Sequence, residues 1–199
     1  IEGVANVAGL LAGEMKGDAR REAEANWLRW ELNLRSLSEQ RGHDDVPLAD
    51  LVARFRLNTF ELKSLVLSIA SHIEPRMAAL VNSASKDTFA RGVTIRLAME
   101  RFCTTATERV TARQSFLPSS PLIRHHLISL GRTEIGSSEG LLSRRMELTT
   151  PTLRFLLKEN ELTESLAKIA RLEFPDVSLL NVILEPEQMT QVRQLVENH

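Results

Sequence analysis

The stretch LADLVARFRLNTFELKSLVLSIASHIEPR, residues 48–76, decides the fold that we predict for this chain. It follows Pro47, a residue that is favoured in the first turn of a helix. The first apolar side chains have helical spacing, and they are Leu48, Leu51, Val52 and Phe55. This spacing predicts a short helix that turns one face toward a core.

A second helix begins a few residues later. Asn58 and Glu61 form a capping-box pattern, in which each side chain bonds a free backbone amide at the helix start. The apolar residues of this helix make one stripe, Leu62, Leu65, Val66, Ile69 and Ile73. Glu74 and Pro75 then end the helix and begin another. Residues 48–76 therefore predict helix, tight turn, helix and the start of a third helix.

Two later helix starts carry capping residues as well. Thr94 can cap a helix over the apolar residues that follow it, and Thr105 with Glu108 repeats the capping-box pattern.

A β-hairpin is predicted farther along the chain. From Ile128 apolar and polar residues alternate as in a strand, and the polar run GRTEIGSSEG, residues 131–140, predicts a turn. The alternation resumes over residues 142–149. Because a helix-turn-helix followed by a hairpin is the plan of a winged helix, we predict a mainly α fold, a helical bundle with a winged-helix-like core.

The chain of 199 residues is long enough for one sizeable core or two small ones. We predict three parts: an N-terminal helical segment over residues 1–46, a winged-helix-like domain over 47–172, and a linker and helix over 173–199. The chain begins with Ile1 rather than with methionine, so we treat it as a piece of a longer protein.

The long helix predicted from Ala19 to Gln40 has a heptad-like seam. Its apolar residues are Ala23, Trp27, Trp30, Leu34 and Leu37, with Leu28 and Leu32 widening the seam. Such a seam pairs with another chain or packs on its own domain, and we favour the latter because it covers only about two heptads. If their rings are exposed, Trp27 and Trp30 are the best candidates for partner-binding residues.

Composition narrows the possible functions. The formal net charge of -1 gives no overall attraction to nucleic acid or anionic lipid. The single cysteine, Cys103, excludes an internal disulfide and fits a reducing cytoplasm, and we expect it to be a small core residue. No apolar run approaches the roughly 20 residues that span a bilayer. We therefore expect a cytoplasmic protein that does not enter a membrane.

The motifs that would indicate an enzyme are missing or lie in the wrong context. Gly136, Ser138 and Gly140 spell G-x-S-x-G, but a nucleophile elbow leads from a strand into a helix, whereas here a strand-like alternation follows. The chain has no G-x-x-x-x-G-K-[ST], no H-E-x-x-H and no C-x-x-C. His43 lies in an acidic polar loop without a second ligand cluster. We predict no catalytic, metal or cofactor site in this chain.

DNA binding is the main alternative function. A winged helix can place the second helix of its pair in the major groove and its wing on the backbone, which requires several cations. The predicted second helix offers Lys63 as its only strong cation, and the wing offers Arg132, Arg144 and Arg145. We therefore place a DNA-binding regulator below a protein-interaction domain. A structural oligomerisation module is the third possibility.

The run RLNTFELKSLVLSIASHIEPRM, residues 56–77, resembles a domain that precedes the ATPase module in certain bacterial AAA-type ATPases, some of them encoded with contractile injection systems. In that family the pattern is a leucine-rich helix, L-[ST]-x-F-E, an apolar helix and E-x-[DE]-P-[RK]. Three later runs are similar to the next helix, to the segment before the wing, and to the wing with its following helix: VTIRLAMERFC, SSPLIRHHLISL and RRMELTTPTLRFLL. Residues 172–199 look like the linker into the ATPase core.

The resemblance extends from Leu48 to the end of the chain and implies a non-catalytic N-terminal domain of an AAA-type ATPase. Such a domain recruits or positions a protein substrate or assembly partner. The ATPase core is absent from these 199 residues and would lie beyond His199. ATP and Mg are therefore expected for the parent protein, a homo-hexamer, and not for this chain.

Overall fold

The computed structural model describes residues 2–11, 17–39, 46–84, 92–131, 140–159, 167–171 and 186–197. The chain forms two compact units, Ile1–Asn160 and Glu161–His199. The second unit contains α11 (Pro186–Glu197), which lies within the segment predicted to hold a linker and a helix, residues 173–199. The elements of the first unit are α1 (Glu2–Leu11), α2 (Asp18–Glu39), α3 (Pro47–Phe55), α4 (Thr59–Ile73), α5 (Pro75–Ala84), α6 (Ile95–Phe102), α7 (Ala106–Gln114), α8 (Pro121–Arg124), β1 (Ile128–Leu130), the 3-10 turn η1 (Leu141–Ser143), β2 (Met146–Leu148) and α9 (Thr150–Leu156).

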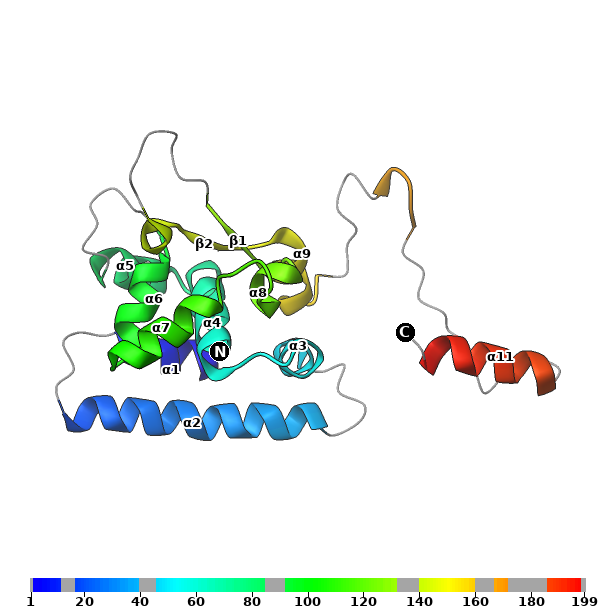
Figure 1. Cartoon of the computed structure of the whole chain (residues 1–199), viewed down its shortest axis with the longest axis horizontal. Helices are drawn as coiled ribbons and strands as arrows, with labels where there is room; N and C mark the ends of the chain where they lie inside the picture. The colour runs from blue at the N-terminus through cyan, green and yellow to red at the C-terminus, as the bar shows by residue number, and fades with distance from the viewer. Residues whose placement is uncertain are drawn as a thin grey trace. The chain divides into compact units, whose positions relative to one another are not determined.

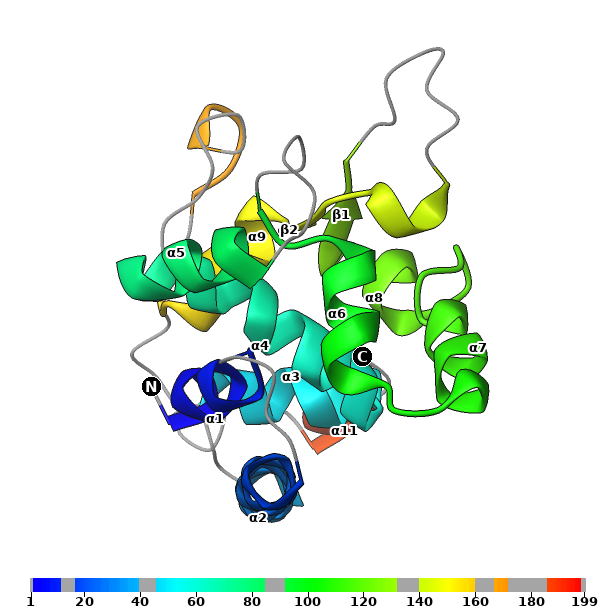
Figure 2. The ribbon, with the colours of Figure 1, turned by 90° about the vertical axis from the view of Figure 1, so that its left-hand side faces the viewer.

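Helix α4 lies at the centre of the first unit, with α1, α5, α6 and β2 packed around it (Figures 1 and 2). The predicted apolar stripe is buried except for Ile73, which is 42% exposed. The other faces of the helix are buried as well, at Ser64, Leu67, Ser68 and Ala70. Only the first turn, near Phe60 and Lys63, and the last residues of α4 are partly open, so this helix does not present the long exposed face that a recognition helix places in a DNA groove.

The predicted tight turn between α3 and α4 is confirmed. Arg56 takes the left-handed conformation, with φ of 49°, and ends α3. The capping box follows, since Asn58 Oδ1 accepts from the Glu61 amide at 2.9 Å and Glu61 Oε2 accepts from the Asn58 amide at 3.0 Å. Leu57, which lies between Arg56 and Asn58, is buried, and its amide donates to the Val52 carbonyl. These bonds satisfy the backbone groups that two helix ends leave open.

Helix α2 runs along the outside of the unit and packs against α1 and α3 (Figures 1 and 2). The seam therefore packs on its own domain, as favoured, with Trp27 and Leu34 buried. The prediction that Leu28 and Leu32 widen the seam is wrong, because these side chains are 53% and 68% exposed. A straight helix that lies on a surface buries only one stripe, and both leucines fall outside that stripe.

The hairpin joins β1 and β2 in an antiparallel pair with Leu130 opposite Met146. The predicted second strand is shorter than expected, because residues 141–143 form η1 and β2 begins only at Met146. The segment before α6 adds a bridge, Thr94 to Arg145, and the Met146 amide donates to the Val93 carbonyl at 2.8 Å. The helices, the bridge at Thr94 and the hairpin thus follow one another along the chain, which confirms the predicted mainly α fold with a winged-helix-like core.

The helices near the N-terminus belong to the first unit. The described helices of residues 1–46 pack in the same unit as the segments from residue 47 onward, because α1 contacts α4 and α5. The linker predicted from residue 173 lies, up to residue 185, outside the described residues.

Helices α6 and α7 begin at caps that the sequence predicts. Thr94 Oγ1 accepts from the Leu97 amide, and Thr105 forms a capping box with Glu108.

Candidate functional site

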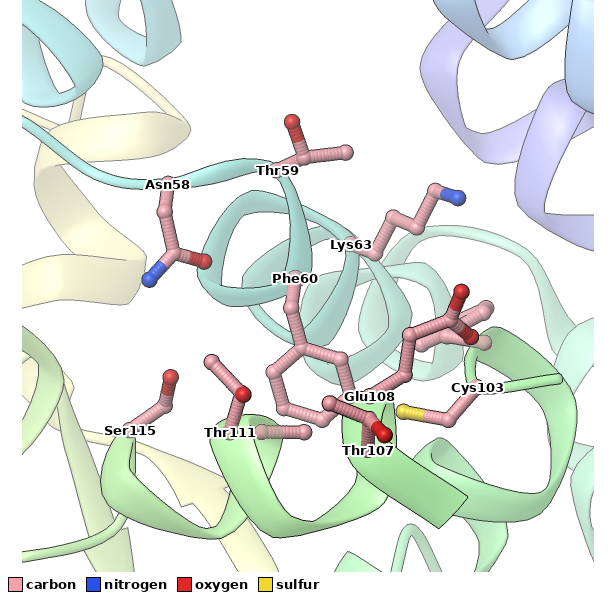
Figure 3. Close-up of a pocket in the computed structure, with 11 residues that line it drawn as sticks. Asn58, Thr59, Phe60, Lys63, Cys103, Thr107, Glu108, Thr111 and Ser115 are labelled. Carbon is pink, nitrogen blue, oxygen red and sulfur yellow. The ribbon is translucent and has the colours of Figure 1, made fainter. Parts of the chain in front are cut away.

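A pocket of about 400 Å³ lies between the start of α4, the end of α6 and one face of α7 (Figure 3). The core brings these three segments together from separate parts of the sequence. The lining residues are Asn58, Thr59, Phe60, Lys63, Phe102, Cys103, Thr107, Glu108, Thr111, Ala112 and Ser115. This volume falls in the range of sites that hold a small ligand or a few side chains.

Aromatic rings make the pocket largely apolar. Phe60 projects from α4 toward α7 (Figure 3). Its ring centroid lies 6.3 Å from that of Phe102 and 5.8 Å from that of Phe116, both in edge-to-face arrangements. Because two rings brace it, Phe60 presents a fixed apolar surface. Ala112 of α7 adds a methyl group to this apolar lining.

Lys63 supplies the cation of the pocket from the α4 side. Its Nζ lies 5.6 Å from the ring centroid of Trp27 and 5.8 Å from that of Phe102. The faces of aromatic rings attract cations at this range. Burial lowers the pKa of Lys63, and the carboxylates of Glu24 and Glu31 partly oppose that shift. The ammonium group is therefore held between rings with little water around it.

Glu108 supplies an anion from the α7 side. Its Oε2 accepts hydrogen bonds from the Thr104 amide at 2.6 Å, the Thr104 hydroxyl at 2.9 Å and the Thr105 amide at 3.2 Å. These bonds lower the pKa of Glu108, and the bond from the Thr104 amide has the largest effect. The carboxylate is therefore ionised and fixed at the start of α7. The pocket has a cation on one side and an anion on the other.

A buried carboxylate fixes the wall that carries Lys63. Glu31 of α2 is 4% exposed, and its Oε1 accepts from Arg35 at 2.7 Å and from the Thr59 hydroxyl at 2.9 Å. Its Oε2 accepts from the Trp27 indole at 2.9 Å. A carboxylate in the interior requires such donors, since an unpaired one is strongly destabilising. Because Thr59 also lines the pocket, this network ties α2 to the pocket wall.

The structure separates the two tryptophans predicted to bind a partner. Trp27 is 0% exposed and lies in the core, so the condition of an exposed ring is not met for it. Its contacts with Glu31 and Lys63 make it a support of the pocket wall. Trp30 is half-buried and covers Gly3 of α1, where an added Cβ would lie 2.5 Å from the Trp30 ring. Partner binding by Trp30 stays a prediction.

Cys103 lies in the pocket wall with its sulfur directed toward α7 (Figure 3). It is 4% exposed, which confirms the prediction of a small core residue. Burial raises the pKa of the Cys103 thiol, and the carboxylate of Glu108 raises it further. The thiol is therefore protonated at neutral pH, and this environment does not activate it as a nucleophile.

The described part of the helix-turn-helix and hairpin exposes arginines that could meet nucleic acid, among them Arg54 and Arg56 at the end of α3 and Arg145 of the hairpin. Helix α7 exposes Arg109 and Arg113 beside the Glu108 carboxylate. Of the wing arginines, Arg144 donates to the carbonyls of Leu130 and Gly131 within the hairpin, at 3.2 and 3.0 Å, and Arg132 lies outside the described residues. Phosphate binding generally uses several free cations.

Other candidate sites from the sequence find no support in the described ranges. His43 and Ser138 lie outside them. Within them, no group of three or more His, Cys, Asp or Glu side chains could hold a metal ion. The same residues include no helix with the length and apolar character needed to cross a bilayer.

The pocket itself is missing from the sequence-based predictions, although its helix starts are not. The capping residues Asn58 and Thr105 are predicted correctly. Phe60 and Lys63 carry a signal, because both lie on α4 outside its apolar stripe. An aromatic residue and a cation off the stripe indicate a second contact surface. That the facing wall comes from Thr107 and Thr111 of α7 depends on long-range packing.

Comparison with known proteins places most of the chain in one family. The family model described as "Winged helix domain, variant" matches residues 11–170. The match includes α2 and every described element of the first unit after it, and therefore all the pocket residues. No curated protein and no solved structure matches this chain.

Proposed function

Since the chain belongs to the family described as "Winged helix domain, variant", we propose that it is a protein-binding module whose partner enters the pocket between α4, α6 and α7. Winged helix domains are general binding modules for nucleic acid or protein and are generally not catalytic. The observation that carries the proposal is the pocket itself, open at the surface of the domain and floored by Phe60 and Phe102. Mostly apolar concave sites with a few placed polar groups are typical of ligand sites.

Charge favours a protein partner over nucleic acid. The formal net charge of the chain is -1, so long-range attraction to a polyanion is absent. Next to the pocket, the cations of α7 are accompanied by Glu108, whose carboxylate would repel phosphate. A peptide, by contrast, can supply an apolar side chain for the floor together with polar groups for the rim.

At a finer level we propose that this domain recruits or positions a protein substrate or assembly partner for an AAA-type ATPase. The parent would be a cytoplasmic homo-hexamer that holds ATP and Mg in its own core. Support comes from the family-like runs: N-T-F-E supplies Asn58, Thr59 and Phe60 of the pocket, and VTIRLAMERFC supplies Phe102 and Cys103. The coding sequence beyond His199 tests this level. A G-x-x-x-x-G-K-[ST] motif there supports it, and a stop codon directly after His199 contradicts it.

A selection experiment tests the binding proposal. The purified chain is used to select from a phage-displayed library of random short peptides, in parallel with a Thr111→Trp variant whose indole would fill the pocket. The matched control is Val110→Trp, because Val110 lies on the same helix, is 69% exposed and does not line the pocket. We expect the wild type and Val110→Trp to enrich the same peptides and Thr111→Trp to lose them.

Two results would contradict the proposal. One is a selection in which Thr111→Trp enriches the same peptides as the wild type, or in which no peptide is enriched at all. The other comes from gel-shift titrations with a duplex of arbitrary sequence. Binding that weakens steeply with salt would place the function in nucleic-acid recognition instead. We expect no shift even at low salt.

A further inference from the structure

Within the described residues, Lys63, the cation that lines the pocket, forms no ion pair. The carboxylates of Glu24 and Glu31 act on Lys63, but each already pairs with an arginine, and Glu108 interacts with Lys63 without forming an ion pair. Glu24 accepts from Arg20 at 3.1 Å, and Glu31 accepts from Arg35 at 2.7 Å. Of these three cations, Lys63 is therefore the one whose nitrogen has no carboxylate oxygen within ion-pair distance.

The contacts of Lys63 Nζ are rings rather than acceptors. No hydrogen bond or ion pair within the described part of the chain involves this nitrogen, which lies over the rings of Trp27 and Phe102. Burial lowers the pKa of Lys63, which means that the charged form is poorly solvated where it lies. A carboxylate brought to this place would supply the hydrogen-bond acceptor that the site itself lacks.

The opposite side of the pocket disfavours a carboxylate. Glu108 is ionised, and its Oε2 is committed to the backbone and hydroxyl groups at the start of α7. An anion placed near α7 would meet this charge directly, whereas an anion near α4 would meet Lys63. The two side chains extend from opposite walls, and both lie to the same side of Phe60 (Figure 3). The pocket therefore orients a ligand that has an apolar part and a negative end.

We propose that the pocket binds a peptide segment that places one apolar side chain on Phe60 and a carboxylate against Lys63. This inference rests on the proposed function, since it assigns the chemistry of the partner at the same site. A volume of about 400 Å³ accommodates an aromatic side chain with the adjoining backbone. The hydroxyls of Thr107 and Thr111 line the α7 wall, where they can bond backbone groups of the peptide.

Defined peptides test the inference on the full chain. The probe is an acetylated, amidated peptide, Gly-Ser-Phe-Asp-Ser-Gly, and its affinity is measured by two-dimensional amide NMR titration. One comparison peptide has Asn for Asp, and another has Ala for Phe. A second pair, Gly-Ser-Gly-Phe with a free or an amidated C-terminus, separates a chain-end carboxylate from a side-chain carboxylate. Because the Asp and Asn peptides are compared on the wild type, this arm does not depend on any variant folding.

We expect the Phe-Asp peptide to shift the amide signals of pocket residues. Replacing Asp by Asn should weaken binding about fivefold to tenfold, as for other partly desolvated charge pairs, and replacing Phe by Ala should abolish the shifts. If the carboxylate comes from a chain end, the free Gly-Ser-Gly-Phe peptide shows the advantage over its amide instead. Lys63→Gln should erase the difference between acid and amide, and the control Lys168→Gln, with the same change of charge, should keep it.

The outcomes separate this inference from the proposed function. Equal affinity of the acid and amide peptides in both pairs overturns the inference, and so does a preference that survives Lys63→Gln. Either result leaves the proposed function standing if Thr111→Trp still abolishes peptide selection. If the selected peptides bind Thr111→Trp as well as they bind the wild type, the proposed function fails whatever the charge of the peptide.

Discussion

Replacing Trp27 by alanine should make the domain far easier to unfold, because this ring attaches α2 to the rest of the domain. Its side chain is 0% exposed and its indole N–H donates to Glu31 at 2.9 Å. Removing a buried aromatic side chain costs about 3 to 5 kcal/mol, and leaving a buried carboxylate short of a donor adds to the loss. We expect a loss of about 4 kcal/mol in the free energy of unfolding, or roughly 8 to 16 °C in the melting temperature of a domain this size.

Urea unfolding followed by far-ultraviolet circular dichroism measures this loss. Trp27→Phe keeps most of the apolar contact and removes the indole donor, so its cost should be smaller, about 1 to 2 kcal/mol. Leu32→Ala is the matched control on the same helix, since Leu32 is 68% exposed. It should change stability by no more than about 0.5 kcal/mol. A Trp27→Ala variant as stable as Leu32→Ala would refute the packing of α2 that supports the pocket wall.

Three further predictions address other parts of the domain. Asn58→Ala removes the capping box of α4 and should cost about 1 kcal/mol in urea unfolding, whereas Asn33→Ala, at an exposed position within α2, should cost less. Because burial lowers the pKa of Lys63, the unfolded chain binds more protons than the folded one between that pKa and 10.5. The stability of the wild type should therefore fall as pH drops from 10.5 through the lowered pKa, and Lys63→Gln should show a flatter profile; equal profiles would contradict the burial of this ammonium group. Gly3→Ala places a methyl group 2.5 Å from the Trp30 ring and should cost about 1 to 3 kcal/mol by thermal melting. The same change in a Trp30→Leu background should cost much less, and an equal cost in both backgrounds would show that the ring is not the obstacle.

Local features of the fold are readable from the sequence where a few neighbouring residues determine them. The capping residues Asn58 and Thr105 act through bonds to amides three positions away, so their patterns predict the helix starts correctly. The hairpin is predicted for the same reason, since strand alternation is local. The 3-10 turn at Leu141–Ser143 is missed, because Leu142 continues the alternating pattern although the backbone there does not.

The pocket is not readable in the same way, because its walls meet only through tertiary packing. Burial of α4 beyond its apolar stripe depends on what surrounds it, and a single stripe of apolar residues predicts only one buried face. The exposed pair Leu28 and Leu32 shows the opposite error, since apolar residues beside a seam need not be covered. Phe60 and Lys63 are the exceptions that could have been noticed, as chemically distinctive residues off the predicted stripe.

Calorimetric titration of one selected peptide against three forms of the full chain tests the central claim most directly. The forms are the wild type, Thr111→Trp and Val110→Trp. The two variants carry the same new ring on the same helix and differ in whether it enters the pocket. If a peptide binds between α4, α6 and α7, Thr111→Trp should lose about tenfold or more in affinity, as expected when an anchor side chain is excluded, and Val110→Trp should match the wild type. Equal affinity for all three forms would mean that the partner binds elsewhere.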